Sequence, residues 1–230
     1  MDVEIVFRPS GISLYHFRSG EIVVSPTREL LIATHNADKL LELRDLLPDL
    51  PFVLVSLSDF PDANPVRETG ATFVENAALK ASGYARQTQV LTLADDSGLE
   101  VDALDRIPGV HSARYLSEAA SYRERMKTLL DELQRVGLAN RNARFVAAIA
   151  IAEADGTIKK VLTGVCEGRI ARAPRGTGGF GYDPIFIPSG FDLTFAELSD
   201  QLKNKISHRA LALKQARAYL QSLTRNSLGG

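Results

Sequence analysis

The segment between residues 143 and 171 constrains the fold of this chain most strongly. Two long, largely apolar stretches, 143–155 and 157–171, are joined at Asp155-Gly156, a dipeptide typical of tight turns between strands. Shorter strand patterns occur at 30–34, 52–60, 90–98 and 185–188. Helical spacing of apolar residues occurs at 39–47, 71–87, 117–136 and 206–223. We therefore predict an α/β fold: an elongated mixed sheet with flanking helices, in two lobes around a central cleft.

The first 28 residues differ from the rest in pattern. Short apolar stretches at 3–7, 12–17 and 21–25 are separated by the turn sequences PSG and RSG. They predict an N-terminal extension, 1–28, folded as a β-hairpin or meander. The main domain is expected over 29–226, followed by a flexible tail at 227–230.

Composition and charge narrow the class of partner. Hydrophobic residues make up 45% of the chain and charged residues 24%, as in an ordinary folded protein. With 27 basic and 28 acidic side chains the net charge is −1, whereas a protein that grips polymeric nucleic acid normally has a basic excess. A nucleic-acid polymer is therefore disfavoured as a partner, but a small phosphorylated ligand is not.

The cysteine count and the apolar segments bear on location. Cys166 is the only cysteine, which rules out an internal disulfide and a zinc site built on two cysteines. No apolar run approaches the ~20 residues that span a bilayer. The N-terminus lacks a basic segment followed by an apolar one, so we expect no signal peptide and no membrane partner. The expected location is the cytoplasm.

The first polar cluster, residues 34–39 (Thr-His-Asn-Ala-Asp-Lys), lies between a predicted strand and a predicted helix. A hydroxyl, an amide and an ammonium group beside a helix N-terminus suit an anion such as a triphosphate. The alternative is a helix cap at Asn36 followed by a solvated Lys39, and this motif alone favours the cap.

A second cluster surrounds the helix predicted at 71–87. Glu68 precedes this helix, and Asn76 and Lys80 lie one turn apart on it. Residues with this spacing share a face, so both side chains can face a cleft. Taken singly, each of these residues is more often found on the protein surface.

The third cluster is a pair of adjacent carboxylates, Asp95 and Asp96, followed by Ser97 and Gly98. In an extended chain neighbouring side chains point in different directions, so one carboxylate can bind a metal while the other orients or deprotonates water. The alternative is an Asx turn completed by the serine, in which the strand ends in a polar turn. The spacing leaves both interpretations open.

The last cluster combines a glycine-rich stretch, 178–184 (GGFGYDP), with a basic stretch, 203–209 (KNKISHR). Glycines let the backbone approach a ligand, and the aromatic residue between them offers a stacking face for a base. His208 and Arg209, which open the last predicted helix, can donate hydrogen bonds to a carbonyl oxygen. Together the four clusters match the base, the phosphates and the metal of one nucleotide.

These motifs resemble those of the inosine-triphosphatase or HAM1-like family of non-canonical purine nucleoside-triphosphate pyrophosphatases. The resemblance covers residues 30–225. Six motifs occur in the family's order: Thr34-x-Asn36-x-x-Lys39, Glu68-Thr69-Gly70 with Phe73-x-Glu75-Asn76-Ala77-x-x-Lys80, Ala94-Asp95-Asp96-Ser97-Gly98-Leu99, Pro108-Gly109-x-x-Ser112-Ala113-Arg114-Tyr115, Gly179-Phe180-Gly181-Tyr182-Asp183-Pro184-x-Phe186 and Ser207-His208-Arg209.

The resemblance implies an activity and a site. It implies an elongated two-lobed fold with a nucleotide-binding cleft, a homodimer, a Mg²⁺ cofactor, and hydrolysis of ITP, dITP, XTP and dXTP to the monophosphate and pyrophosphate, which cleanses the nucleotide pool. Asp96 matches the family's general base and a metal ligand, with Glu68 and Asp95 as further metal-associated acids. The implied triphosphate contacts are Thr34, His35, Asn36, Ala37, Asp38, Lys39, Lys80 and Ser97. The implied purine pocket is formed by Phe180, Gly181, Tyr182, Asp183, Lys203, His208 and Arg209.

Two residues depart from the family pattern. His35 and Asp38 stand where the family often has smaller residues, commonly glycine before the lysine. An acidic Asp38 beside a phosphate site would repel substrate unless its side chain points away or holds a cation.

Two rival functions remain at this stage. One is a Maf-like pyrophosphatase acting on pyrimidine or modified nucleotides, a family that lacks the FGYDP and SHR motifs found in this chain. The other is a nucleotide-binding sensor without turnover. The presence of Glu68, Asp95 and Asp96 disfavours the sensor, because binding alone does not require carboxylates that serve a metal and a water molecule.

Overall fold

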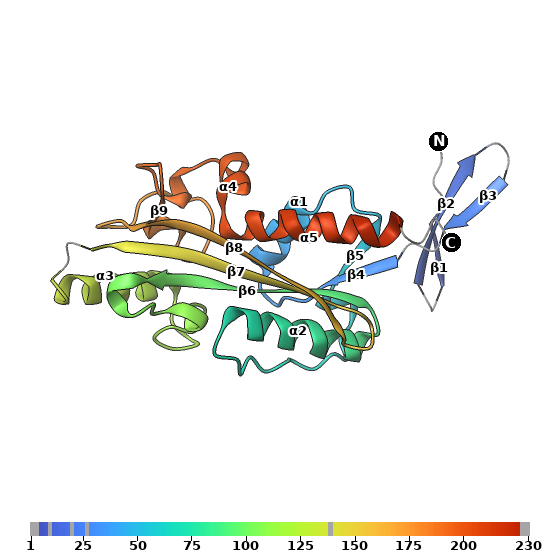
Figure 1. Ribbon diagram of the computed structural model, residues 1–230, viewed down its shortest axis with the longest axis horizontal. Helices are drawn as coiled ribbons and strands as arrows, with labels where there is room; N and C mark the ends of the chain where they lie inside the picture. The colour runs from blue at the N-terminus through green and yellow to red at the C-terminus, as the bar shows by residue number, and fades with distance from the viewer. Residues whose placement is uncertain (1–4, 9–10, 19–20, 26–27, 138–139, 226–230) are drawn as a thin grey trace.

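The computed structural model describes residues 5–8, 11–18, 21–25, 28–137 and 140–225, which form two β-sheets. The strands β1 (Ile5–Arg8), β2 (Gly11–Arg18) and β3 (Glu21–Ser25) form an antiparallel three-stranded sheet in that order. Figure 1 shows this small sheet beyond the start of β4 (Arg28–Ile32). The second sheet has six strands in the order β5-β4-β6-β7-β8-β9.

The six-stranded sheet has a parallel part and an antiparallel part. β4 lies between β5 (Phe52–Ser56) and β6 (Leu91–Val101) and is parallel to both. Beyond β6 the strands β7 (Asn142–Ala152), β8 (Ile158–Ile170) and β9 (Phe186–Pro188) continue antiparallel. β7 and β8 are the long paired strands that the turn at Asp155-Gly156 predicts.

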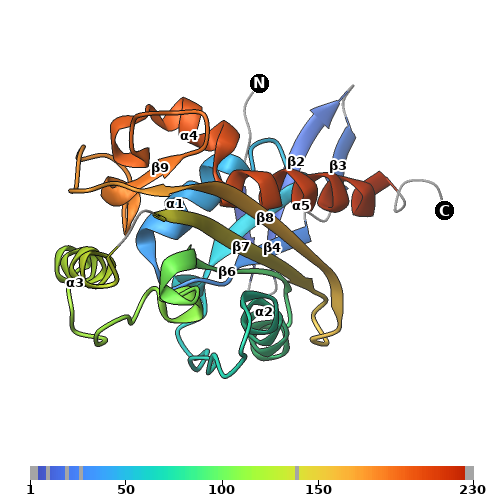
Figure 2. The same ribbon diagram turned by 60° about the vertical axis from the view of Figure 1, so that its left-hand side comes forward.

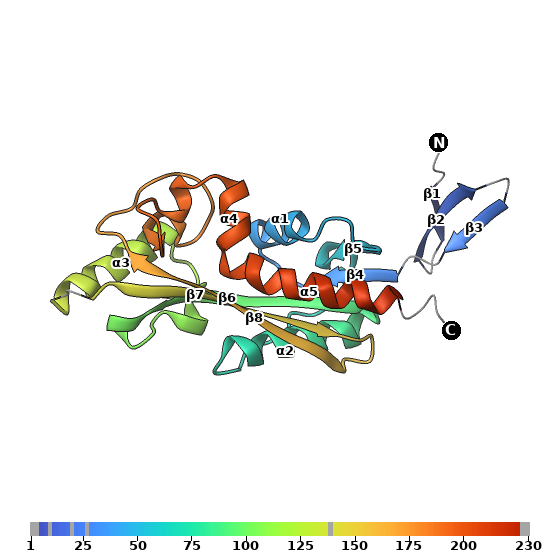
Figure 3. The ribbon, with the colours of Figure 1, turned by 45° about the horizontal axis from the view of Figure 1, so that its top comes forward.

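Helices cover both faces of the sheet (Figures 1 and 3). The alternation of side chains along β4 sends Leu30 and Ile32 into a core with α1 (Ala37–Leu46) and α5 (His208–Arg225). Leu31 points to the other face, where it joins a core with α2 (Phe73–Thr88). The sheet is therefore the middle layer of a helix–sheet–helix sandwich at this end of the molecule.

A third core lies at the other end of the long strands. α3 (Tyr122–Arg135) contributes Met126, Leu129 and Leu133, which pack with Phe145 of β7 and Phe186 of β9. Figure 2 shows α3 and the short helix α4 (Asp200–Ile206) at this end of the sheet. This separate core forms the second lobe, so the predicted elongated mixed sheet with flanking helices is confirmed.

Three sequence predictions differ from the structure. The strand expected at 52–60 ends at Ser56, because Asp59 accepts hydrogen bonds from the Ser56 backbone N–H (2.7 Å) and Oγ (2.9 Å) and so begins a 3₁₀ turn at Leu57–Asp59. The helix expected at 117–136 begins only at Tyr122, after the Ser121 cap. Residues 200–206, which were not predicted as helical, form α4.

The ends of the chain are only partly described. The strands expected at 12–17 and 21–25 coincide with β2 and β3, and the described part of the strand expected at 3–7 coincides with β1, while residues 3 and 4 lie outside the described residues. The tail predicted at 227–230 lies outside the described residues. The division at residue 28 between an extension and a main domain stays a prediction. Within the described part of the chain, no helix is both long enough and apolar enough to cross a membrane.

Candidate active site

The carboxylates Asp95 and Asp96 lie in the middle of β6, so the interpretation of this motif as a polar turn is wrong. Both residues pair with β7, Asp95 opposite Ile149 and Asp96 opposite Ala148, and both are buried (1% and 6% exposed). Successive side chains of a strand point to opposite faces. Asp95 therefore faces α1 and α5, and Asp96 faces α2.

The site lies where β4 and β6 separate. β4 pairs with β6 only from Leu91 to Leu93, and the chain then turns away into α1. β6 continues for eight further residues, and its edge beyond Leu93 is not covered by β4. A place where neighbouring strands diverge in this way is where α/β proteins usually bind ligands.

On the α1 and α5 face, Asp95 is held by two cations. Lys39 Nζ lies 2.8 Å from its Oδ2 and Arg209 Nε lies 3.4 Å from its Oδ1, while Ser97 Oγ donates a hydrogen bond to Oδ2 (3.0 Å). Burial alone would raise the pKa of Asp95, but the charges of Lys39 and Arg209 outweigh it and hold the pKa well below its usual range. Asp95 is thus a permanent anion that fixes both cations.

On the α2 face, Asp96 and Glu68 share one lysine. Lys80 Nζ lies 3.1 Å from Asp96 Oδ1 and 3.3 Å from Glu68 Oε1. Burial raises the pKa of Asp96 to about 6; Lys80 opposes this rise, and Glu68 adds to it. Asp96 therefore changes protonation near neutral pH, as a general base requires.

The donor set at Asp96 suits a divalent cation only in part. Asp96 Oδ2 is buried and has no hydrogen-bond partner among the described residues, so one carboxylate oxygen is available to a ligand. Glu68 provides a second carboxylate on the same side. In the described part of the chain, no group of three or more acidic, histidine or cysteine side chains is gathered closely enough to hold an ion. A cation here would complete its shell with water and substrate oxygens, as Mg²⁺ usually does.

The turn at residues 34–39 combines both interpretations of its sequence. Asn36 caps α1, since its Oδ1 accepts the Lys39 backbone N–H (2.9 Å), and Thr34 Oγ1 accepts the Asn36 N–H (3.2 Å). Lys39 is not solvated, because its side chain is only 16% exposed and binds Asp95. Asp38 is exposed and forms no ion pair in the described part of the chain. Ala37 is the first residue of α1.

His35 contacts a residue that sequence reasoning did not select. Its Nε2 lies 2.8 Å from the Oη of Tyr84, a buried residue of α2. A cavity of about 290 Å³ adjoins His35 on the side of β5, where Ser56 and Ser58 line it. The turn at residues 34–39 is therefore held by two contacts: His35 with Tyr84 of α2, and Lys39 with Asp95 of β6.

The expected purine pocket is assembled around Phe180. Lys203 Nζ lies 5.0 Å and Arg209 Cζ 5.5 Å from the centre of the Phe180 ring. Asp183 fixes this arrangement, because its Oδ2 accepts the Phe180 N–H (3.0 Å) and a hydrogen bond from Lys203 Nζ (2.7 Å). Gly181, at φ 66°, adopts the left-handed conformation that glycine tolerates best.

Further residues complete the wall of the pocket. His208 is buried and stacks on Phe145, with ring centres 4.6 Å apart, and its Nδ1 has no hydrogen-bond partner among the described residues. Burial, reinforced by the charge of Arg209, holds the pKa of His208 well below its usual range, so the ring is neutral. Tyr182 is buried and donates a hydrogen bond to the Ser112 carbonyl oxygen (3.1 Å).

The pocket around Phe180 is narrow. The cavity between Phe180, Lys203, His208 and Arg209 measures about 40 Å³, far less than the cavity of about 290 Å³ beside His35. Phe180 lies on the cations where a base would stack. The flanking glycines, Gly179 and Gly181, both at φ 66°, let the backbone pass close to Asp183, since a Cβ at Gly179 would clash with Asp183 Oδ2.

Sequence reasoning missed Glu42. This residue of α1 lies 2.5 Å from Arg209 Nη1 through Oε2 and 3.8 Å from Lys203 Nζ through Oε1. Its position three residues after Lys39 on a predicted helix was the available signal, because that spacing places both side chains on one face. Tyr122, the first residue of α3, also lines the pocket and was not predicted.

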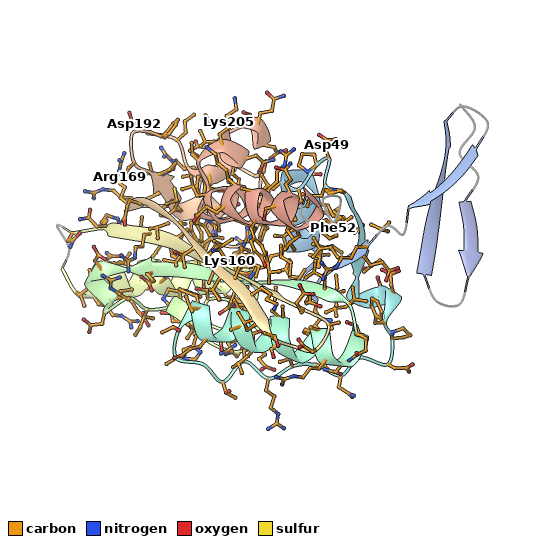
Figure 4. The ribbon with its side chains drawn as sticks, turned by 45° about the vertical axis from the view of Figure 1, so that its right-hand side comes forward. Asp49, Phe52, Lys160, Arg169, Asp192 and Lys205 are labelled. Atoms are coloured by element: carbon orange, nitrogen blue, oxygen red, sulfur yellow. The ribbon has the colours of Figure 1, made fainter. Side chains whose placement is uncertain are left out.

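The structure brings most of the expected residues together around β6. Within α4 it separates two lysines: Lys203 is buried in the site, whereas Lys205 is exposed at the outside of the molecule (Figure 4). Among the expected triphosphate contacts, Ala37 and Asp38 bring no cation or buried donor side chain to the site. The fold and this site define an α/β protein with a charged, largely buried ligand site beside the end of a parallel strand.

The chain belongs to the Ham1 family, whose sequence profile matches residues 30–219. The dITP/XTP pyrophosphatase of Geobacillus kaustophilus is 49% identical over 186 residues, which is 81% of this chain and 91% of that protein. The dITP/XTP pyrophosphatase of Halalkalibacterium halodurans is 46% identical over 194 residues, covering 84% of this chain and 99% of that protein.

Solved structures show the same fold. A HAM1 protein from Coxiella burnetii superposes with a TM-score of 0.79 at 42% identity, covering 85% of this chain and all of that chain (100%). The Ham1 protein of Staphylococcus aureus gives a TM-score of 0.76 at 38% identity, with 85% and 99% coverage. The family resemblance drawn from the six motifs is therefore confirmed.

Proposed function

We propose that this chain hydrolyses the non-canonical purine nucleoside triphosphates ITP, dITP, XTP and dXTP to the monophosphate and pyrophosphate. The observation that carries the proposal is that β6 holds one ion pair on each face, Asp95 with Lys39 and Asp96 with Lys80. The pocket formed by Phe180 and Lys203 lies next to them. The relatives named dITP/XTP pyrophosphatase, which are 49% and 46% identical to this chain, support the same activity.

Asp96 is the proposed general base. Its raised pKa, about 6, lets it hold a proton transiently near neutral pH, and its Oδ2 is free to accept one from a water molecule. We propose that Asp96 and Glu68 hold Mg²⁺. When bound, Mg²⁺ would neutralise phosphate oxygens and so favour attack by water.

Asp95 takes a different part in this proposal from the one its motif implies. Because Lys39 and Arg209 already neutralise it, we assign Asp95 the positioning of these two cations rather than direct contact with the metal. Lys39 would then face the phosphates from the α1 side and Lys80 from the α2 side. The N-terminus of α1 adds backbone donors for the same anion. The Ser97 hydroxyl helps Asp95 to position Arg209, because it donates to Asp95 and accepts from Arg209.

Base selection follows from the chemistry of the pocket. Phe180 offers a ring face to the purine, while Lys203, Arg209 and the neutral His208 offer hydrogen-bond donors. The 6-oxo group of hypoxanthine or xanthine accepts such bonds, whereas the 6-amino group of adenine leaves the donors unpaired. Discrimination between ITP and ATP on the order of 10²-fold or more in kcat/KM is therefore expected.

The proposal includes a homodimer in the cytoplasm, with a small nucleotide rather than a nucleic-acid polymer as ligand. The family resemblance supports the dimer, and the net charge of −1 supports the choice of ligand. Light scattering at micromolar concentration should give about twice the chain mass of 25.1 kDa. A monomer at all concentrations would contradict the dimer.

A substrate panel tests the proposed function. Pyrophosphate release is measured with Mg²⁺ for ITP, dITP, XTP, ATP, GTP and dTTP, each supplied separately. The proposal predicts that ITP, dITP and XTP, whose 6-oxo group accepts hydrogen bonds, lead ATP and dTTP by at least about 10² in kcat/KM. GTP carries the same 6-oxo group, so its rate measures how far the 2-amino group of guanine is rejected. Equal use of dTTP or ATP would favour the Maf-like alternative. Binding of ITP without any turnover would favour the sensor.

A further inference from the structure

Tyr84 joins two segments of the site that are far apart in the sequence. Its hydroxyl lies 2.8 Å from His35 Nε2 in the turn at residues 34–39. The same oxygen accepts the backbone N–H of Val66 (3.3 Å), two residues before Glu68. Because Oη already accepts from Val66, its own proton is available to the imidazole. We call this arrangement, from His35 through Tyr84 Oη to Val66, the Tyr84 bridge.

The bridge lies next to the catalytic cluster on the same face of α2. Lys80 and Tyr84 are four residues apart, so their side chains follow one another along this helix. Lys80 binds Asp96 and Glu68. Tyr84 binds the turn at residues 34–39, which we call the phosphate turn, and the segment of residues 64–70, which we call the Glu68 segment. Since Tyr84 is buried (2% exposed), its ring has little freedom to move.

The segment that carries Glu68 is fixed to α2 on both sides of that residue. On one side Gly83 leaves room for Val66, since a Cβ at Gly83 would lie 2.7 Å from Val66 Cγ2. On the other side Asn76 Oδ1 accepts the backbone N–H of Gly70 (2.8 Å). The position of Glu68 is therefore set by contacts with α2, and the Tyr84 hydroxyl is the contact that also reaches the phosphate turn.

We propose that Tyr84 is a positioning residue that couples the phosphate turn to the Glu68 segment, so that binding of the pyrophosphate group and binding of Mg²⁺ strengthen each other. This inference rests on the proposed function, because it assigns these two segments to phosphate and metal. Displacement of His35 by an anion in the turn is transmitted through the hydroxyl to Val66, and hence to Glu68. Tyr84 itself touches neither ligand.

Calorimetric titration with inorganic pyrophosphate, in the absence of Mg²⁺ and with MgCl₂ present, tests this coupling without turnover. The wild type should bind pyrophosphate more tightly when Mg²⁺ is present. Mg²⁺ also binds free pyrophosphate in solution, equally for every variant, so the coupling is the part of this factor that changes with the protein. In Tyr84→Phe this factor should fall about three- to tenfold, the effect of one neutral hydrogen bond. An unchanged factor in Tyr84→Phe, or no coupling in the wild type, would overturn the inference.

Two further variants make the test specific. His35→Ala cuts the bridge at an exposed residue, so it carries the test even if Tyr84→Phe folds poorly, and it should reduce the coupling by the same factor. In the double variant, Tyr84→Phe with His35→Ala, the coupling factor should fall no further than in either single variant. If the two reductions of the coupling factor multiply in the double variant, Tyr84 and His35 act independently of each other. That result would contradict the bridge.

Gln87→Met is the matched control. Gln87 ties Asn64 of the same segment to α2, through its Oε1 (2.7 Å) and Nε2 (3.1 Å), but does not contact the phosphate turn. The coupling factor of Gln87→Met should stay within about twofold of the wild-type value even if the melting temperature of this variant falls. A loss as large as in Tyr84→Phe would show that loosening the segment is sufficient, and the bridge would be rejected. If the wild type shows coupling but does not hydrolyse dITP, the proposed function fails and the bridge does not.

Discussion

The carboxylate of Glu42 on α1 lies 2.5 Å from Nη1 of Arg209 at the start of α5, and both side chains are buried. The pair joins two helices of one face of the sheet at the edge of the pocket that we propose for the purine. Arg209 also donates a hydrogen bond from Nη2 to Ser97 Oγ (2.8 Å), so its guanidinium plane is fixed on two sides. A planar, pre-oriented donor of this kind favours a carbonyl acceptor over an amino group.

Removal of the Glu42 side chain should therefore reduce the selectivity for ITP over ATP more than it changes the dependence of the rate on Mg²⁺. Glu42→Ala leaves a buried guanidinium with fewer partners, and we expect a loss of about 1–3 kcal/mol in the free energy of unfolding. The ratio of kcat/KM for ITP to that for ATP should fall about tenfold, with little change in the Mg²⁺ concentration for half-maximal rate. Asp45→Ala, at an exposed position of the same helix, should preserve the ratio. An unchanged ratio in Glu42→Ala would refute the assigned role.

Phe180 should act on all purines alike. Stacking depends on the ring face and not on the exocyclic group, so Phe180→Ala should weaken binding of ITP, XTP and ATP by a similar factor. A stacked base is worth roughly 1–3 kcal/mol, or about five- to 150-fold in Kd. Binding measured with Asp96→Asn as the background avoids turnover during the titration. A loss confined to ITP would show that Phe180 reads the base edge.

Activity should depend on pH through Asp96. The carboxylate must be ionised to accept a proton, and its pKa is raised to about 6, so kcat/KM should rise with pH through about 6 and level off above it. A cation beside Asp96 favours the ionised form, and higher Mg²⁺ should therefore move the midpoint to lower pH. The Kd of dITP over the same range separates ionisation of the substrate from that of Asp96. A midpoint that moves upward with Mg²⁺ would contradict this assignment.

The first strands should be dispensable for the chemistry. Among the residues that the structure describes, β1, β2 and β3 pair with one another and with no strand of the larger sheet, and no expected site residue lies in them. Deletion of residues 2–27 keeps Arg28, which forms an ion pair with Glu153 at the end of β7. The shortened protein should hydrolyse ITP with kcat/KM within about threefold of the full chain. A variant that folds and dimerises but lacks activity would place this segment in the site.

Local patterns predicted the elements better than the contacts between them. The Asn36 cap and the helix after it follow from residues that are neighbours in the sequence, and both were predictable. The sequence Asp-Asp-Ser-Gly suggests a turn locally, yet pairing with β7 along Thr92–Val101 keeps it extended. That pairing joins residues about fifty positions apart, which local propensity cannot register.

The same distinction applies to the site. Asp96 and Lys80 were selected because their motifs resemble those of a known family, and the structure places them 3.1 Å apart. Glu42 and Tyr84 act through partners that are distant in sequence, Arg209 and His35, and neither belongs to a motif. Buried polar residues on predicted helices could be noticed from spacing, but their partners become visible only in the folded chain.

The direct test of the central claim, that the Asp96 cluster carries the hydrolysis, is a paired measurement on Asp96→Asn. The single-turnover rate with dITP and the Kd of dITP are measured for the wild type, for Asp96→Asn and for Asp102→Asn, an exposed control just beyond β6. We predict that Asp96→Asn loses on the order of 10³-fold in rate while its Kd stays within about threefold, because the phosphate and base contacts remain. Asp102→Asn should match the wild type. Wild-type turnover by purified Asp96→Asn would contradict the account.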